Sequence, residues 1–165
     1  MYIITKDRKS KPVSFSSIDN QKIELFSNTA ANEFFYGSRM LQVVGKIASL
    51  VANRHCECLC DMQGIDFVRF FSTIKKDDLL LCSSSVNRVW GSVMEIGIKV
   101  ICEDFRTLEK SKSMSAYFTF VCYDENNNTQ YLPIAIPQSD EQKRRYLQAE
   151  KRRAAKFKSS CSKEI

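Results

Sequence analysis

The stretch His55–Cys60, HCECLC, contains an imidazole and three thiols, the side chains that bind transition metals. In a metal site, His55 would supply a nitrogen ligand. Structural zinc usually combines a C-x₂₋₄-C pair with a second such cluster, and the sequence holds no second cluster. Alternation along a strand predicts instead that Cys56, Cys58 and Cys60 share one face, where free cysteine behaves as a small apolar residue. We therefore expect no metal site here.

The seven cysteines of the chain are expected to be reduced thiols. Their number is odd, and the N-terminus has no apolar block followed by a small-residue cleavage site, so nothing in the sequence predicts export. The longest apolar runs are too short to cross a bilayer. These observations predict a cytoplasmic protein without a membrane span.

Positive charge is concentrated at the C-terminal end of the sequence. Residues 138–165 hold nine Lys/Arg and four Asp/Glu, whereas the remainder holds sixteen and fifteen. Ser139 and Gln142 form a capping-box pattern, which predicts an exposed helix with charge pairs such as Glu141 with Arg145. Because the charge is mixed and aromatic residues do not alternate with it, a solvated helix is favoured over a nucleic-acid-binding strip.

The segment from about Ser38 to Asn53 predicts a long buried helix. Its apolar positions form a stripe wider than a surface helix needs, so we expect other structure to wrap most of it. Gly45 lies inside this stripe, and a glycine there costs a helix about 1 kcal/mol relative to alanine. The glycine calls for a structural or a functional explanation.

Extended segments account for most of the remaining sequence. The clearest spans 92–104, where apolar residues alternate with Glu95, Gly97 and Lys99, the pattern of a strand with one wet face. A strand, a long helix and four strands joined mainly by hairpins predict an α+β fold with an antiparallel sheet. We expect an irregular segment over 1–20, one domain over 21–137 and a basic helix and tail over 138–165. The expected strands are 21–26, 56–71, 77–90, 92–104 and 113–124.

Four strings between residues 65 and 153 carry a resemblance to a known family. In chain order they are IDFVRF (65–70), NRVWGSVMEIGIKVICED (87–104), SAYFTFVCYDENN (115–127) and LPIAIPQSDEQKRRYLQAEKRR (132–153). Their order and spacing resemble the acyl-CoA thioester hydrolases of the hot-dog fold, in the cytosolic acyl-CoA hydrolase branch. The resemblance implies a long helix wrapped by a curved antiparallel sheet of about five strands.

The resemblance also implies an activity, an assembly and the absence of a required cofactor. The substrate would be fatty acyl-CoA, cleaved by water to the free acid and coenzyme A, so that coenzyme A is part of the substrate or product. The family's protomers form homodimers by joining two sheets, and the dimers commonly assemble as trimers of dimers. The active site lies at the dimer interface.

The family's catalytic pattern is incomplete in this sequence. The helix of the family begins with a Gly-Gly pair, and an acidic residue follows eight positions after the first glycine. The corresponding positions here are Gly37, Ser38 and Gly45, so the carboxylate is missing. General-base assistance of this kind is typically worth about 10²–10⁴ in rate.

The remaining site candidates divide into catalytic and coenzyme-binding residues. Backbone N–H groups around Gly37 and Ser38 could still polarise a thioester carbonyl. The residues that could replace the missing acid are Asn32, Gln42 and Asp61, with Asn28 as a further candidate. The residues that could contact coenzyme A are Arg88, Gly91, Ser92 and Arg39, with Lys46, Arg144 and Arg145 as weaker candidates.

Two functions therefore follow from the resemblance. The first is hydrolysis of acyl-CoA with a relocated catalytic group. The second is a catalytically impaired protein that binds acyl-CoA, coenzyme A or a protein partner, because Gly45 replaces the helix carboxylate. Nucleic-acid binding by the basic tail has only charge in its favour.

Overall fold

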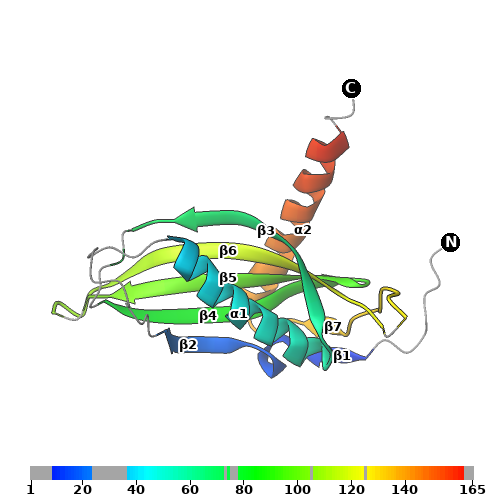
Figure 1. Cartoon of the computed structure of the whole chain (residues 1–165), viewed down its shortest axis with the longest axis horizontal. Helices are drawn as coiled ribbons and strands as arrows, with labels where there is room; N and C mark the ends of the chain where they lie inside the picture. The colour runs from blue at the N-terminus through cyan, green and yellow to red at the C-terminus, as the bar shows by residue number, and fades with distance from the viewer. Residues whose placement is uncertain are drawn as a thin grey trace.

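The computed structural model describes residues 9–23, 37–72, 74, 78–104, 106–124 and 126–161, with side chains described as far as residue 157. Five long strands, one central helix and a terminal helix make up most of the structure (Figure 1). The elements are β1 (Ser10–Pro12), the 3₁₀ helix η1 (Val13–Phe15), β2 (Ile18–Ile23), α1 (Gly37–Cys56), β3 (Cys60–Phe70), β4 (Leu79–Trp90), β5 (Val93–Glu103), β6 (Lys110–Cys122), β7 (Ile134–Ile136) and α2 (Asp140–Cys161).

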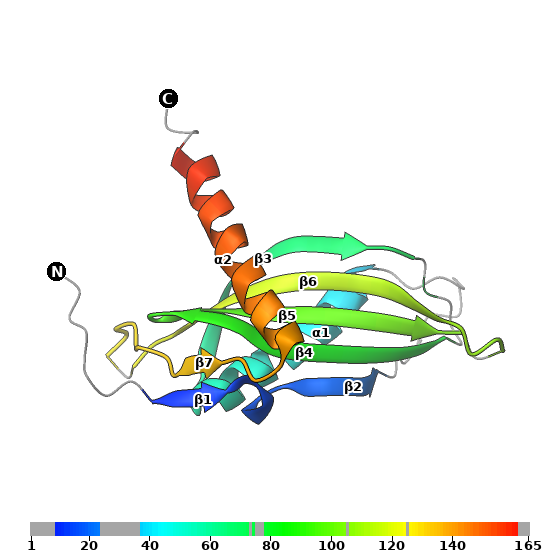
Figure 2. The same ribbon diagram turned by 180° about the vertical axis from the view of Figure 1, so that it is seen from behind.

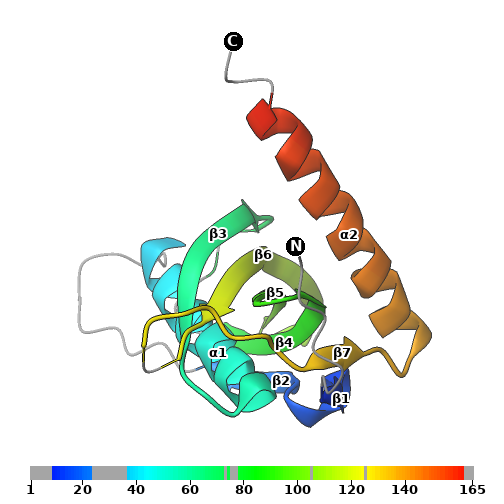
Figure 3. The ribbon, with the colours of Figure 1, turned by 90° about the vertical axis from the view of Figure 1, so that its right-hand side faces the viewer.

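The main sheet is antiparallel and has the strand order β2-β4-β5-β6-β3. Figure 1 shows α1 crossing one face of the sheet, and Figure 2, seen from behind, shows α2 crossing the other. The sheet curls, as the end-on view in Figure 3 shows. The predicted α+β fold with about five antiparallel strands and a C-terminal helix is confirmed. None of the helices in the described part of the chain is long and apolar enough to cross a membrane.

The core lies between α1 and the concave face of the sheet. Met40, Val44 and Val51 of α1 are buried against apolar residues of the sheet, among them Phe118 and Phe120. The alternation predicted for 92–104 is present, with Met94, Ile96, Ile98 and Val100 buried on one face. One flank of α1 is open, however, and Leu50 on that flank is 41% exposed. The single chain therefore wraps α1 less completely than its composition suggests.

The second face of β5 is not wet along its whole length, contrary to the prediction. Glu95 is only 8% exposed, because α2 covers it and Arg152 of α2 binds its carboxylate. Helix α2 begins as predicted: the Gln142 N–H donates to Ser139 Oγ over 3.2 Å, and Gln142 Oε1 accepts from the Ser139 N–H over 3.4 Å. The Glu141–Arg145 pair also forms, at 3.3 Å.

The prediction of an irregular segment over 1–20 is wrong for its described part. Strand β1 pairs in parallel with β7, and β2 already begins at Ile18 rather than at residue 21. The buried His55 near the end of α1 contacts both this N-terminal region and the segment that leads into β7. Its Nδ1 lies 3.3 Å from Ser16 Oγ, and its Nε2 lies 3.1 Å from the Pro133 carbonyl oxygen. Burial lowers the pKa of His55 below 6.5.

The cysteine-rich stretch does not form one strand face, contrary to the prediction. Cys56 is the last residue of α1, Glu57 adopts a left-handed φ of 57°, and β3 begins only at Cys60. The expectation that every thiol is reduced is also contradicted, because Cys58 is joined to Cys122 in a disulfide. The sequence could not predict this pairing, since 64 residues separate the two cysteines.

Candidate active site

The N-terminus of α1 lies against the end of β3. A Cβ placed on Gly37 would lie 3.0 Å from Cζ of Phe70, so the helix starts in close contact with that ring. Ser38 and Arg39 follow on the exposed surface. The first N–H groups of a helix have no partner within the helix, and the helix dipole makes this end positive. This terminus is therefore suited to bind a carbonyl oxygen that gains negative charge.

An apolar groove of about 640 Å³ runs along the open flank of α1. Its polar members include Gln42, Lys46, Ser49 and Asn53, and the residues that line it are Leu41, Gln42, Gly45, Lys46, Ser49, Leu50, Asn53, Met62 and Ile65. Gln42 and Gly45 thus share one groove, as their spacing of three helical residues predicts. A groove of this size and composition can hold an alkyl chain and a few polar groups.

Gly45 is not required by close packing within the chain. A Cβ built on this residue would lie 3.6 Å from Cε of Met62 and 3.9 Å from Cε1 of Phe118, which are ordinary contact distances. Its carbonyl oxygen accepts a hydrogen bond from Ser49 Oγ over 3.0 Å, a bond that any residue could make. The position could therefore hold a side chain that enters the groove.

The proposed substitutes for the missing acid lie in different places. Gln42 lines the groove beside Gly45. Asp61 precedes Met62 on β3, and because consecutive side chains of a strand point to opposite faces, Asp61 points away from α1. Asn32 and Asn28 lie outside the described residues. Of the described candidates, the chain itself therefore brings only Gln42 to the groove.

The predicted coenzyme-binding turn lies at the other end of the sheet. Gly91 and Ser92 form the two-residue turn between β4 and β5, with a left-handed φ of 68° at Gly91. Val93 after the turn is level with Val121 of β6, and Cys60 of β3 is level with the adjacent Cys122. The contact between Gly37 and Phe70 marks the opposite end of β3. Within one chain, the Gly91–Ser92 turn and the N-terminus of α1 therefore lie at opposite ends of the sheet.

Arg88 is held by α2. Its Nη2 lies 2.9 Å from Glu150 Oε2, and its guanidinium stacks 4.0 Å from the ring centre of Tyr146. The nearby Gly91 carbonyl accepts a hydrogen bond from the Leu132 N–H over 2.9 Å. Arg144 and Arg145, the weaker phosphate candidates, line a small polar groove of about 150 Å³ between α2 and the sheet.

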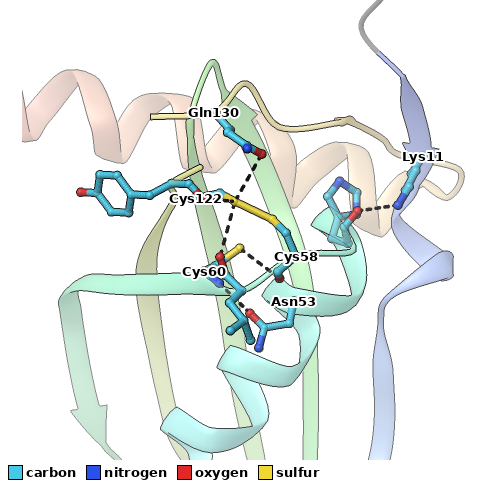
Figure 4. Close-up of a disulfide and its surroundings, with 9 residues drawn as sticks. Lys11, Asn53, Cys58, Cys60, Cys122 and Gln130 are labelled. Carbon is cyan, nitrogen blue, oxygen red and sulfur yellow. Dashed lines mark hydrogen bonds between the residues drawn. A yellow bond between two sulfur atoms is a disulfide. The ribbon is translucent and has the colours of Figure 1, made fainter. Parts of the chain in front are cut away.

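The structure also brings together residues that sequence reasoning missed. Arg152 and Asn87 both bind the buried Glu95, and no local pattern marks these residues as partners. Four cysteines lie where α1 ends and β3 begins, and Figure 4 shows three of them, Cys58, Cys60 and Cys122; the fourth is Cys56. A hydrogen bond between the thiols of Cys56 and Cys60 lowers the pKa of Cys60 and raises the pKa of Cys56. Spacing marked three of these cysteines, but only the fold adds Cys122.

The curved antiparallel sheet around α1 defines the hot-dog class, and comparisons with known proteins agree. No family model matches the chain. Protein VdlD of Helicobacter pylori is 33% identical over 122 residues, covering 74% of this chain and 70% of that protein. The uncharacterized acyl-CoA thioester hydrolase YkhA of Bacillus subtilis is 30% identical over 115 residues, covering 70% and 67%.

Solved structures give the same result. An apo-hexameric acyl-CoA thioesterase superposes with a TM-score of 0.85 at 26% identity, covering 92% of this chain and 97% of that one. The acyl-CoA hydrolase of Bacillus cereus superposes with a TM-score of 0.81 at 26% identity, covering 93% and 96%. The chain belongs to the acyl-CoA thioester hydrolases of the hot-dog fold.

Proposed function

We propose that this protein hydrolyses fatty acyl-CoA to a free acid and coenzyme A. The observation that carries the proposal is the family membership, found at 30% identity or more across two thirds of the relatives' length. The geometry supports the proposal, because an apolar groove of about 640 Å³ begins at Leu41, one turn from the positive end of α1. A binding protein without activity is the less favoured alternative, since the Bacillus subtilis relative and the Bacillus cereus structural neighbour are named as acyl-CoA hydrolases.

The helix N-terminus supplies the electrostatic part of the mechanism. Water attacks the thioester carbonyl carbon, and the carbonyl electron pair moves onto oxygen. Backbone N–H groups at Gly37 and Ser38 stabilise that oxyanion, and one such donor is typically worth about 3 kcal/mol. Collapse of the intermediate breaks the carbon–sulfur bond, and the proton given up by the attacking water ends on the sulfur, so that the free acid and the coenzyme thiol are released.

The water is positioned without a helix carboxylate. Gln42 lies in the groove and can orient water through its amide, although it cannot accept a proton at neutral pH. Asn32 and Asp61 are further candidates for positioning the water. Because Asp61 points away from α1 of its own chain, it could act only in the site of a neighbouring protomer. We therefore expect a slow enzyme relative to one with the carboxylate in place.

The site is completed by a second copy of the chain, joined edge to edge through β3. β3 ends the strand order, and its surroundings expose an unusual number of apolar side chains, namely Leu59, Met62, Ile65, Phe67, Val68, Phe70 and Phe71. Antiparallel pairing of two β3 strands sets the Phe70 end of one protomer beside the Cys60 end of the other. The helix N-terminus at Gly37 then approaches the partner's Gly91–Ser92 turn.

Further features of the proposal follow from the same arrangement. Arg88, Gly91, Ser92 and Arg39 would contact the pantetheine and phosphates of coenzyme A, and no other cofactor is required. The dimers would assemble as trimers of dimers, as the hexameric name of one structural neighbour suggests. A cytoplasmic location would match the cytosolic acyl coenzyme A thioester hydrolase of mouse, which is 22% identical over 122 residues.

The test is release of free thiol from a panel of acyl-CoA esters of increasing chain length. The native protein should release thiol above the uncatalysed rate. Gly45→Asp should raise that rate by about 10²-fold, because it restores a general base on the groove. Gly45→Asn is the matched control, since it has the same shape without a basic carboxylate, and it should leave the rate within a few-fold of native.

A silent native protein that Gly45→Asp activates would contradict hydrolysis as the native function. It would show a sound scaffold and support the binding alternative. Equal rates for Gly45→Asp and Gly45→Asn would contradict the placement of the missing base. If the native protein turns over, single changes of Gln42, Asn32 and Asp61 to alanine identify the group that positions the water.

A further inference from the structure

Four cysteines lie at the corner of the molecule where α1 ends, β3 begins and β6 ends. The Sγ atoms of Cys56, Cys58 and Cys60 all lie within 4.8 Å of one another. The Sγ of Cys122, from the last residue of β6, is bonded to that of Cys58, as Figure 4 shows. The sequence alone argues against a metal site here, because it holds no second cluster and because alternation predicts that the three thiols share one strand face. The fold removes both reasons.

The corner presents these thiols from three differently oriented pieces of backbone. Cys56 closes the helix, Cys58 lies in the following turn, and Cys60 opens β3 in register with Cys122. The left-handed Glu57 turns the chain between the first two. The Cys60 N–H donates to Asn53 Oδ1 over 2.9 Å, which fixes the turn to the helix. The sulfurs of Cys56, Cys58 and Cys60 therefore approach one another from different backbone directions, and Cys122 adjoins them through Cys58.

We propose that in its reduced form this protein binds one Zn²⁺ ion through Cys56, Cys58, Cys60 and Cys122. Tetrahedral coordination with zinc–sulfur bonds of about 2.3 Å sets sulfurs about 3.8 Å apart. The Sγ atoms of Cys56, Cys58 and Cys60 lie within 4.8 Å of one another, and Cys122 would supply the fourth ligand from its place beside Cys58. The Cα atoms of Cys58 and Cys122 are 7.3 Å apart. Two sulfur–metal bonds span that separation more readily than one direct sulfur–sulfur bond.

The disulfide and the zinc site exclude each other. Opening the Cys58–Cys122 bond takes two electrons and two protons. A dithiol supplies both and becomes a disulfide, whereas a phosphine supplies the electrons and becomes a phosphine oxide, with water supplying the oxygen and the protons. Zinc then displaces the protons of four thiols and binds four thiolates. Reducing compartments maintain thiols in this state. Lys11 places a cation beside the cluster, with its Nζ 2.8 Å from the His55 carbonyl oxygen, and the same Nζ lies 3.1 Å from Glu57 Oε2 in the turn between Cys56 and Cys58.

The zinc would be structural, because four protein thiolates leave no open position for a substrate or water. It would fasten the end of α1 and the start of β3 to the end of β6. Within the chain this corner is separated from Gly37 by the whole of the 20-residue α1, about 30 Å. The inference does not rest on the proposed hydrolysis.

The experiment measures metal directly. The full chain is purified with a phosphine reductant and without chelator, and its zinc is quantified by mass spectrometry of the elements. We expect about one zinc per chain. After zinc is removed, anaerobic titration with Co²⁺ should give the visible ligand-field bands of tetrahedral cobalt and the near-ultraviolet charge-transfer bands of cobalt–thiolate bonds, saturating at one equivalent.

Variants then assign the ligands. Cys122→Ser and Cys58→Ser should each lower Zn²⁺ affinity at least tenfold and change the cobalt spectrum. Cys102→Ser, a buried cysteine outside the cluster, should bind as the native chain does. Circular dichroism checks that each variant is folded. The Co²⁺ titration of the native chain tests the proposal independently of whether the variants fold.

Several results would overturn the proposal. These are a reduced native chain that binds no stoichiometric Zn²⁺ or Co²⁺, iron found in place of zinc, and native affinity in folded Cys122→Ser. Thiol mapping that finds the Cys58–Cys122 disulfide intact under reductant would also overturn it.

Discussion

Arg152 of α2 donates two hydrogen bonds to the buried Glu95 of β5, 2.7 Å from Nη2 to Oε1 and 3.1 Å from Nε to Oε2. The same guanidinium lies 3.7 Å from the ring centre of Tyr117. Asn87 Nδ2 adds a third hydrogen bond to the carboxylate at 2.8 Å. This arrangement holds the terminal helix on the outer face of the sheet.

Removing the guanidinium should destabilise the protein strongly. Arg152→Ala leaves the carboxylate of Glu95 buried without its cation, and breaking such a pair costs about 3 kcal/mol. Urea unfolding measures the change. Arg144→Ala on the exposed part of α2 is the control and should cost less than about 0.5 kcal/mol. Equal stability of the two variants would show that Arg152 does not anchor α2.

Gly97 is required by a close approach, unlike Gly45. A Cβ on Gly97 would lie 2.6 Å from Nδ2 of Asn87, so Gly97→Ala must displace that side chain and its bond to Glu95. We expect a loss of about 1–3 kcal/mol in unfolding free energy. Gly64→Ala is the matched strand control, since nothing lies within 4 Å of its added Cβ. A Gly97→Ala chain as stable as Gly64→Ala would contradict the close contact.

The buried thiol of Cys82 should make the stability of the native state fall at alkaline pH. Burial raises the pKa of its thiol from 9.0 to about 12. Between these values the unfolded thiol loses its proton while the native one keeps it, so native stability is full below pH 9 and falls as pH rises toward 12. The slope from this group is on the order of 1 kcal/mol per pH unit. Urea unfolding at pH 8 and 10 should show a smaller decrease for Cys82→Ala than for the native chain, and equal decreases would refute the assignment.

The β3 edge should control assembly. Val68→Lys places a cation on an apolar strand edge, and in an edge-to-edge dimer it would meet its own copy or a desolvated surface. Light scattering after size exclusion should show smaller particles and thiol release should drop with them. Leu147→Lys on α2, where the leucine is 60% exposed, is the control and should assemble as the native chain does. A monomeric native chain, or unchanged assembly of Val68→Lys, would rule out this edge.

Local patterns predicted most of the elements because the signals are short-range. The helix from Ser38 to Asn53 is present, with its ends at Gly37 and Cys56. Period-two alternation found β5 to within one residue at each end. The errors fall where tertiary contacts decide. β1 and β2 depend on β7 and β4 for their hydrogen bonds, and the helix end at Cys56 overrides the strand pattern of the cysteines.

The candidate site was only partly predictable for the same reason. Helical spacing correctly placed Gln42 on the flank that carries Gly45. It could not show that Asp61 points away, that Arg88 is held by Glu150, or that Cys122 joins the other cysteines. Each of these depends on chain segments that are remote in sequence.

The sequence by itself determined the fold class, the family and the absence of the helix carboxylate, because residue periodicity and residue identity are properties of the chain alone. The tertiary structure decided which groups meet. It opened the groove beside Gly45, set the Gly91–Ser92 turn at the opposite end from Gly37, buried Glu95 under Arg152 and gathered four sulfurs at one corner. Such encounters result from packing and strand register, which bring together residues that no local pattern connects.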